Sequence, residues 1–257
     1  MYDQLSKDYD RFVNWENRLP FEIPFIIQLL DAIPSRSARP KRILDTACGT
    51  GMHSLTLAKS GFEVVGCDLN PEMIQKARVN GRNAGYSLRF EEIGFGSLVE
   101  ALNEDEFDAV LCLGNSLPHL LSQQELGQAL LDFKGCLRSE GLLLVQNRNF
   151  DAVMEQKERW MEPQTHHDNH NEWLFQRFYD FLPGGLIQFN IVTLKRTAHS
   201  KWKTSLSSTL LRPQLHQDLE ESLVSSGFIR LQSYGSLKGE PFDPQKSSNL
   251  IVTAFKP

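Results

Sequence analysis

The sequence predicts an α/β fold built on a doubly wound parallel β-sheet, with an antiparallel β insertion late in the chain. Between residues 42 and 147, short apolar runs alternate with helix-like stretches, as parallel strands joined by crossover helices do. The first of these runs leads into a turn containing Gly49 and Gly51. Between residues 160 and 212 the alternation stops, and two long β-like runs flank a Pro-Gly-Gly segment at 183–185, which is a hairpin signal.

The expected elements supply seven strands for the main sheet. The N-terminus predicts a short helix marked by Leu5, Tyr9, Phe12 and Val13, and Pro20 is expected to open a second helix at 21–32. A linker follows at 33–40. The strands are expected at 42–47, 63–67, 87–92, 107–113, 141–147, 229–234 and 249–255. The helices between them are expected at 51–60, 71–84, 123–137 and 215–226.

Residue types at two of these helix starts support the assignment. Asn70 can cap a helix that has Pro71 in its first position. Ser122, with Glu125 three residues later, fits a capping box.

The chain is expected to divide into three segments. Residues 1–159 hold the N-terminal helices and the ligand-binding α/β core, residues 160–212 form the antiparallel insertion, and residues 213–257 return to the core. Because the insertion interrupts the core pattern after the fifth strand, we expect it to stand over the ligand pocket as a lid.

Composition narrows the function classes. A net charge of -5 provides no general field that attracts nucleic acid. No apolar run approaches the roughly 20 residues that span a bilayer, and the N-terminus lacks a signal pattern. The four cysteines are widely spaced without a C-x-x-C pair, so buried, reduced thiols are expected rather than disulfides or a metal site. We therefore expect a cytoplasmic protein with neither a nucleic-acid nor a membrane partner.

The glycine turn carries the clearest chemical signal. Its two glycines let the backbone approach a ligand closely, and Asp68 ends the next strand, where a carboxylate can bind ribose hydroxyls. Ser54 stands where a dinucleotide fingerprint has its third glycine. Asp45 would repel a pyrophosphate but suits a sulfonium and an ammonium group. These details favour S-adenosylmethionine over nicotinamide or flavin dinucleotides. Asp68 could instead cap the next helix, but Asn70 is better placed for that.

Segments 45–51 and 107–116, with Asp68, resemble class I S-adenosylmethionine-dependent methyltransferases. Within that class, segments 112–120 and 146–151 are similar to the G-N-S-x-x-H-L and H-R-N-Y-D segments of the glycine and sarcosine N-methyltransferases. The resemblance implies a Rossmann-like, doubly wound, seven-stranded methyltransferase sheet. It also implies methyl transfer from S-adenosylmethionine to a small-molecule acceptor, the amine of an amino acid or of another carboxylated compound.

The resemblance also assigns roles to single residues. It places Gly49 and Gly51 at the methionine portion of the cofactor, Asp68 at the ribose, Arg18 at the cofactor's carboxylate and Phe95 at the adenine. The full expected cofactor set is Arg18, Asp45, Ala47, Gly49, Gly51, Asp68, Leu69, Met73, Gly94, Phe95 and Leu113.

Three further residues are expected at the acceptor. The resemblance implies that Asn115 orients the amine and that Arg148 holds the carboxylate, and a guanidinium fork at a strand's carboxyl end suits that task. His119 or a water would accept the proton. Arg148 could instead pair with a surface carboxylate such as Asp151, and His119 could be structural.

Several alternatives stay open. Asn147 and Phe150 replace a histidine and a tyrosine of the family segments, which leaves open whether glycine itself is the acceptor. The polar stretch 166–170, with three histidines, is expected to be a solvated loop and not a metal site. A small-molecule O-methyltransferase and a non-catalytic binding protein with this fold are the competing functions. The sequence does not distinguish a monomer from a homo-oligomer.

Overall fold

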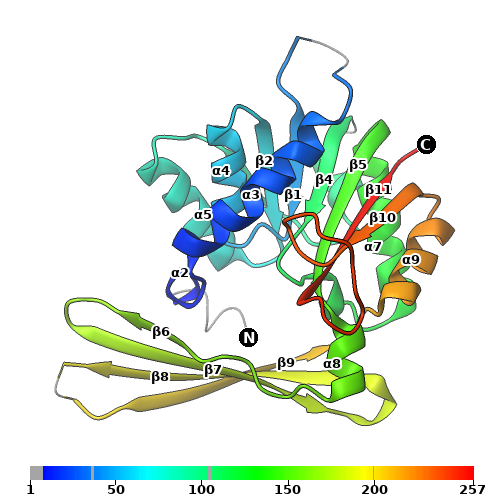
Figure 1. Ribbon diagram of the computed structural model, residues 1–257. Helices are drawn as coiled ribbons and strands as arrows, with labels where there is room; N and C mark the ends of the chain where they lie inside the picture. The colour runs from blue at the N-terminus through cyan, green and yellow to red at the C-terminus, as the bar shows by residue number, and fades with distance from the viewer. Residues whose placement is uncertain (1–7, 36–37, 104–105, 199) are drawn as a thin grey trace.

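The computed structural model describes residues 8–35, 38–103, 106–198 and 200–257. Two β-sheets organise this part of the chain, a seven-stranded sheet and a four-stranded sheet below it in Figure 1. Leu5 of the expected first helix lies outside the described residues.

The seven-stranded sheet has the order β10-β11-β5-β4-β1-β2-β3. Its strands are β1 (Arg42–Thr46), β2 (Glu63–Asp68), β3 (Arg89–Glu92), β4 (Phe107–Cys112), β5 (Leu137–Arg148), β10 (Ile229–Tyr234) and β11 (Asn249–Phe255). Strands β1 to β5 pair in parallel. β11 pairs antiparallel with both β5 and β10. The expectation that the parallel pattern resumes at the end of the chain is therefore wrong for β11.

Helices cover both faces of this sheet, which confirms the doubly wound α/β fold. α3 (Trp15–Asp31), α4 (Met52–Lys59) and α5 (Pro71–Asn83) lie on one face, where Ile26, Leu30 and Leu57 join the apolar core. α6 (Leu98–Leu102), α7 (Gln123–Cys136) and α9 (His216–Ser225) cover the other face. The predicted caps are present at Asn70 of α5 and at Ser122 of α7, the latter as a full capping box.

Two expected boundaries are wrong. α3 begins at Trp15, with Asn14 as its N-cap, so Pro20 and Pro24 lie inside the helix instead of opening it. Proline inside a helix removes a backbone hydrogen bond and costs about 3 kcal/mol, which burial of the apolar face of α3 offsets. β5 begins directly after α7 at Leu137, four residues before the expected strand, and a register shift interrupts its pairing with β4.

Three short helices do not figure among the expected elements. They are α6, α8 (Phe150–Gln156) and the 3-10 turn η1 (Leu117–His119). α2 (Tyr9–Phe12) precedes α3. A helix of one or two turns is too short to show a clear apolar period in the sequence.

The four-stranded sheet is antiparallel, as the hairpin signal predicts. It consists of β6 (Gln164–His167), β7 (Asn171–Phe181), β8 (Ile187–Thr197) and β9 (Lys203–Leu211), in that order. η2 (Pro183–Gly185) joins β7 to β8. β6 is a correction, because the expected solvated loop at 166–170 begins with two residues of this strand, His166 and His167.

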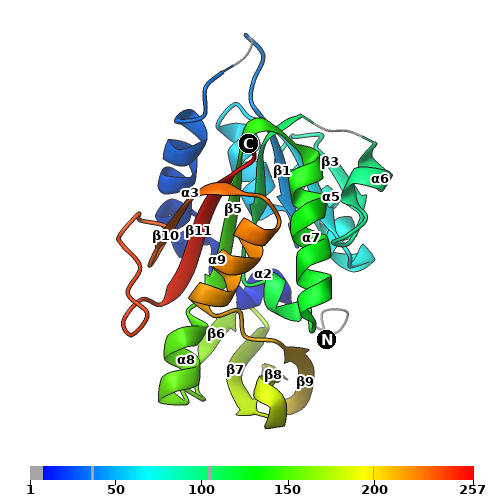
Figure 2. The same cartoon turned by 90° about the vertical axis from the view of Figure 1, so that its right-hand side faces the viewer.

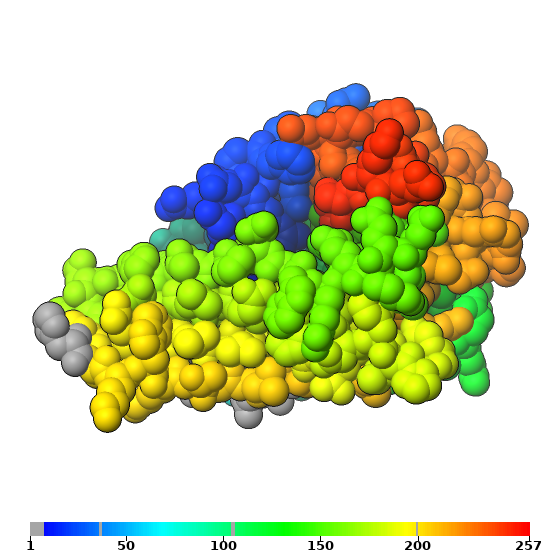
Figure 3. All heavy atoms as spheres, turned by 60° about the horizontal axis from the view of Figure 1, so that its bottom comes forward, coloured from blue at the N-terminus to red at the C-terminus, as the bar shows by residue number. Residues whose placement is uncertain are grey.

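This second sheet lies at the carboxyl ends of the parallel strands. Figures 1 and 2 show it below the core, beside α8 and α2. In Figure 3, seen from below, its yellow-green and yellow residues form a slab across the front of the molecule. The sheet is thus placed where ligands bind in such folds.

Within the described part of the chain, the helices are all too short or too polar to cross a membrane. All four cysteines are buried, as expected: Cys48, Cys67, Cys112 and Cys136.

Candidate active site

The turn after β1 is built from residues in the left-handed region. Ala47, Gly49 and Gly51 have φ of 54°, 57° and 76°. The Cys48 backbone N–H donates to the Cys67 carbonyl at 2.8 Å, which ties the turn to the end of β2. The Asp68 carboxylate accepts from the backbone N–H groups of Gly49 (2.8 Å) and Asn70 (2.9 Å). The glycine turn and the strand-end carboxylate therefore form one unit.

A cavity of about 610 Å³ opens beside this unit, within the size range of small-molecule sites. Ten of the eleven expected cofactor residues line it, namely Arg18, Asp45, Ala47, Gly49, Asp68, Leu69, Met73, Gly94, Phe95 and Leu113. Gly51 lies behind the turn, where a Cβ would stand 2.8 Å from the ring of Phe90. Gly51 thus serves the close packing of the turn and not the cavity wall.

Burial raises the pKa of both carboxylates that line the cavity. Asp45 is only 2% exposed and accepts from the Ser54 hydroxyl at 2.5 Å, and burial raises its pKa. Burial also raises the pKa of Asp68, although the two backbone N–H donors oppose the shift. A carboxylate has about four acceptor positions, and the two backbone bonds leave Asp68 with positions for hydroxyl donors.

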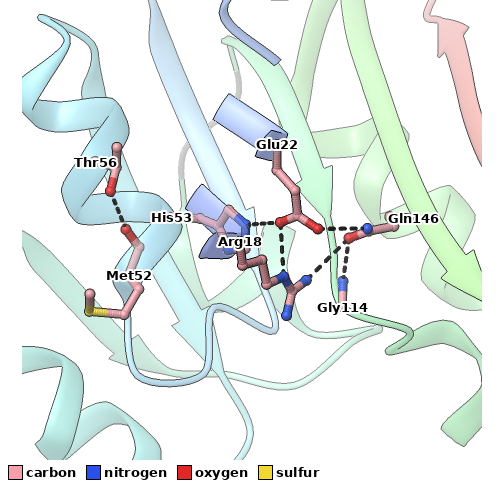
Figure 4. A network of polar contacts seen from close by, with 7 residues as sticks. All are labelled: Arg18, Glu22, Met52, His53, Thr56, Gly114 and Gln146. Atoms are coloured by element: carbon pink, nitrogen blue, oxygen red, sulfur yellow. Dashed lines mark hydrogen bonds and ion pairs between the residues drawn. The ribbon is translucent and has the colours of Figure 1, made fainter. Parts of the chain in front are cut away.

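A buried polar network connects α3 to the strand ends beside the cavity (Figure 4). The Glu22 carboxylate accepts from His53 Nε2 (2.7 Å), Arg18 Nε (2.9 Å) and Gln146 Nε2 (3.0 Å). Gln146 Oε1 in turn accepts from the Gly114 backbone N–H at 3.1 Å. The network fixes Arg18 against the ends of β4 and β5.

Glu22 is ionised in this network. Burial alone would raise its pKa, but the hydrogen bond from His53 and the charge of Arg18 outweigh burial and lower the pKa to about 2. The positive charge of Arg18, expected at the cofactor's carboxylate, is therefore shared with Glu22.

A second cavity of about 480 Å³ adjoins the first. Both are lined by Tyr9, Arg18, Gly114 and His119. Asn115 and Arg148, two of the expected acceptor residues, line only the second cavity, and His119 lies at the junction. The structure thus brings the three expected acceptor residues to one place.

Asn115 and Arg148 touch directly at the ends of adjacent strands. Asn115 Oδ1 accepts from the Arg148 backbone N–H at 2.9 Å, and Asn115 itself has a φ of 69°. This oxygen keeps a second lone pair. Arg148 Nη2 donates to Glu158 at 2.7 Å, whereas Asp151 accepts from the His216 backbone N–H. A carboxylate does pair with Arg148, but it is not Asp151.

His119 lies in a partly buried position within η1. Burial lowers its pKa to about 4, so the imidazole is neutral at pH 7 and holds a proton weakly.

Of the three histidines at 166–170, His166 is partly buried, and His167 and His170 are exposed. His166 packs its ring against Trp173 at 5.5 Å, and Asp168 accepts from the backbone N–H groups of His170 and Asn171 in the turn after β6. Among the described residues, no group of three or more His, Cys, Asp or Glu side chains has the arrangement of a metal site.

Four residues of the site have no role in the sequence-based prediction. Glu22, His53 and Gln146 form the network above, and Arg177 of β7 lines the second cavity. Two of them carry a signal in hindsight. Glu22 is a charge among apolar residues of α3, and Arg177 interrupts the alternating apolar positions of β7. Apart from these four, Tyr179 of β7 lines the second cavity as well.

Comparison with known proteins agrees with this geometry. The family described as "Methyltransferase domain" matches residues 43–141. The glycine/sarcosine N-methyltransferase of Halorhodospira halochloris is 37% identical over 156 residues, covering 60% of this chain and 55% of that protein. Human glycine N-methyltransferase is 36% identical over 126 residues, or 44% and 43% of the two chains. The chain spans about half the length of the relatives it matches.

Solved structures show the same fold over nearly the whole chain. A Clostridium acetobutylicum S-adenosylmethionine-dependent methyltransferase aligns with a TM-score of 0.78 at 16% identity, covering 99% of this chain and 98% of its own. CalS10, an amino pentose methyltransferase of Micromonospora echinaspora, aligns with a TM-score of 0.65 at 19% identity, covering 96% of each chain. The resemblance stated from the sequence motifs is confirmed.

Proposed function

We propose that this chain, which carries the methyltransferase domain and fold, transfers the methyl group of S-adenosylmethionine to the amine of a small carboxylated acceptor. The observation that supports this most strongly is the pair of adjoining cavities. One is lined by the glycine turn and Asp68, the other by Asn115 and Arg148. Their shared wall is where a methyl group could pass from one ligand to the other.

The first cavity fits the cofactor. Bound S-adenosylmethionine supplies a methyl carbon already activated by its positive sulfur. Asp68 offers free carboxylate positions for ribose hydroxyls, and the left-handed turn at Gly49 brings backbone close to the ligand. A bound cationic sulfur would favour the charged form of Asp45, whose pKa burial raises.

The second cavity positions the acceptor. Asn115 would accept from the amine through the lone pair of Oδ1 that Arg148 leaves free, and Arg148 would contact the carboxylate. Holding a neutral amine in line with the methyl group supplies most of the acceleration in such a reaction. With a pKa of about 4, His119 would not keep the proton released by the product amine. We propose that this proton passes to water.

The segments 1–159 and 213–257 act in this proposal as the core, and 160–212 acts as a lid over the acceptor. Met161, Gln164, Arg177, Tyr179, Phe189 and Ile191 of that segment line the second cavity. The four-stranded sheet would exclude water from the acceptor, and the core would form the walls of the cofactor cavity. The free cysteines also support the proposed cytoplasmic location.

An acceptor screen tests the proposed function. Purified protein with S-adenosylmethionine is incubated with glycine, sarcosine, other amino acids and biogenic amines, and the products are analysed by mass spectrometry. We expect N-methylated carboxylated amines. An O-methylated product would favour the O-methyltransferase alternative. Cofactor binding without any methylated product would favour a non-catalytic binding protein.

Arg148→Lys is expected to weaken acceptor use about tenfold in kcat/KM while cofactor affinity stays within twofold. Lysine keeps the charge but loses the planar fork that contacts a carboxylate with two parallel hydrogen bonds. Steady-state kinetics on both substrates measures the change. Glu158→Gln is the matched control, because it removes the ion-pair partner of Arg148 and leaves the guanidinium in place. Equal kcat/KM for wild type and Arg148→Lys would mean that this guanidinium serves the fold.

A further inference from the structure

The three guanidinium groups that line the second cavity differ in how their charge is neutralised. Arg18 pairs with Glu22 at 2.9 Å, and Arg148 pairs with Glu158 at 2.7 Å. Across the described residues, no Asp or Glu oxygen lies within 4.0 Å of the third guanidinium, that of Arg177. The excess positive charge of this cavity therefore belongs to Arg177.

Arg177 occupies a position in β7 that otherwise buries aromatic rings. Alternate residues of a strand point to the same face, and Trp173, Phe175 and Tyr179 on this face are at most 2% exposed. The Arg177 guanidinium stacks on the Phe12 ring of α2, 5.1 Å from its centroid. Burial lowers the pKa of Arg177, and the nearby charge of Arg148 lowers it further. The fold thus holds the charged Arg177 side chain in an environment that disfavours charge.

Unsatisfied polar atoms gather around the same cavity. Seven buried side-chain nitrogen or oxygen atoms of the described residues lack a hydrogen-bond partner. Five of them belong to four residues that line this cavity: Asn147 (both amide atoms), Arg148 Nε, Gln164 Oε1 and Arg177 Nε. A buried polar group without a partner is unfavourable, so this concentration indicates that a polar ligand completes the cavity.

From this charge distribution we infer that Arg177, a lid residue, is a second anchor for the carboxylate of the methyl acceptor, beside Arg148. Arg148 shares its charge with Glu158 in a partly exposed ion pair, whereas no carboxylate of the described residues pairs with Arg177. Arg177 can offer two parallel N–H donors to a carboxylate, because its guanidinium is planar, and this group lies over the ring of Phe12. The inference rests on the proposed function only in naming the ligand of this cavity as the acceptor.

Acceptor binding through Arg177 would also hold the lid against the core. Arg177 comes from β7, whereas Asn115 and Arg148 follow strands of the core. A carboxylated amine held by Arg177 and Asn115 together links the lid to the core. Acceptor binding should therefore stabilise the closed arrangement of the two sheets.

Calorimetry on protein saturated with S-adenosylhomocysteine tests the inference. The probes are glycine, sarcosine and serine, each compared with its primary amide, which lacks the negative charge. We expect at least one carboxylated probe to bind, at least tenfold more tightly than its amide. Arg177→Met, which keeps the length of the side chain, should weaken that binding at least tenfold, and Arg177→Lys should weaken it less.

Two measurements separate this role from a structural one. The melting temperature of ligand-free Arg177→Met should equal or exceed that of wild type, because the variant removes a partly buried charge that no carboxylate of the described residues pairs. Arg159→Met is the matched control, since Arg159 is an exposed arginine near the lid that pairs with Asp180 and lines neither cavity. Its probe affinities should stay at the wild-type value.

The inference is overturned if no carboxylated probe binds wild type, or if Arg177→Met binds the probes as wild type does. Methyl transfer measured in the same samples reports on the proposed function separately. Binding that depends on Arg177 without any methylated product would reject the proposed function and leave the inference standing. Methyl transfer that is unchanged in Arg177→Met would reject the inference and leave the proposed function standing.

Discussion

Glu22→Gln is expected to destabilise the protein by about 3 kcal/mol at pH 7. The Glu22 carboxylate binds Arg18, His53 and Gln146 in a buried network, and its side chain is only 7% exposed. Removing one partner of a buried ion pair typically costs about 3 to 5 kcal/mol, because the remaining charge is left uncompensated. Urea denaturation at pH 7 measures the difference in the free energy of unfolding.

The lowered pKa of Glu22 predicts that the folded protein loses stability at acidic pH. Its pKa falls from 4.5 to about 2 in the folded protein, which corresponds to about 3 kcal/mol of stabilisation. For a lowered carboxyl pKa, this stabilisation is fully present above pH 4.5 and is lost as the pH falls towards 2. The stability difference between wild type and Glu22→Gln should therefore shrink over that interval.

Glu16→Gln is the control for both measurements. Glu16 lies in the same helix, α3, but is exposed, and exposed substitutions usually change stability by less than about 0.5 kcal/mol. Equal stability of the Glu22 and Glu16 variants would contradict the account of the network.

Asp68→Ala should weaken the binding of S-adenosylmethionine and S-adenosylhomocysteine by about 2 to 3 kcal/mol, or roughly 30- to 150-fold in Kd. The variant removes a charged acceptor for two ribose hydroxyls. It also removes the hydrogen bonds that hold the Gly49 and Asn70 backbone N–H groups. Isothermal calorimetry with both ligands measures the loss.

Two variants isolate the contribution of the carboxylate. Asp68→Asn keeps the size of the side chain and one acceptor oxygen, so it should fall between wild type and Asp68→Ala. Glu92→Ala is the matched control, because Glu92 is the register partner of Asp68 on β3 but is exposed and lies outside the cavity lining. Unchanged affinity in Asp68→Ala would remove this carboxylate from the site.

The parts of the fold that the sequence predicts well are those set by local pattern. Apolar runs of the right length give the core strands, and a residue that ends such a run lies at the carboxyl edge of the sheet. For that reason Asp68, Asn115 and Arg148 are all found where the sequence places them.

The errors arise where tertiary contacts decide. The direction of β11 depends on how the chain returns after β10, which no local pattern encodes. α3 extends before Pro20 because Asn14 caps it and the sheet buries its apolar face, and packing of this kind routinely overrides propensity.

Prediction of the site is limited in the same way, by contacts between residues far apart in the sequence. Gln146 bonds to Glu22 across 124 positions of sequence, so the network that holds Arg18 cannot be seen before the fold is known. Arg177 lies in a segment that the sequence predicts only as sheet. That no carboxylate of residues 8–35, 38–103, 106–198 and 200–257 pairs with it is visible only in three dimensions.

The proposed function requires the two adjoining cavities to hold the cofactor and the acceptor on either side of their shared wall. A crystal structure of the complex with S-adenosylhomocysteine tests it most directly. We predict the ribose on Asp68 and the sulfur facing the junction at Gly114 and His119, open to the second cavity. A sulfur directed away from that junction, or a ligand bound outside the cavity beside Gly49, would contradict the account.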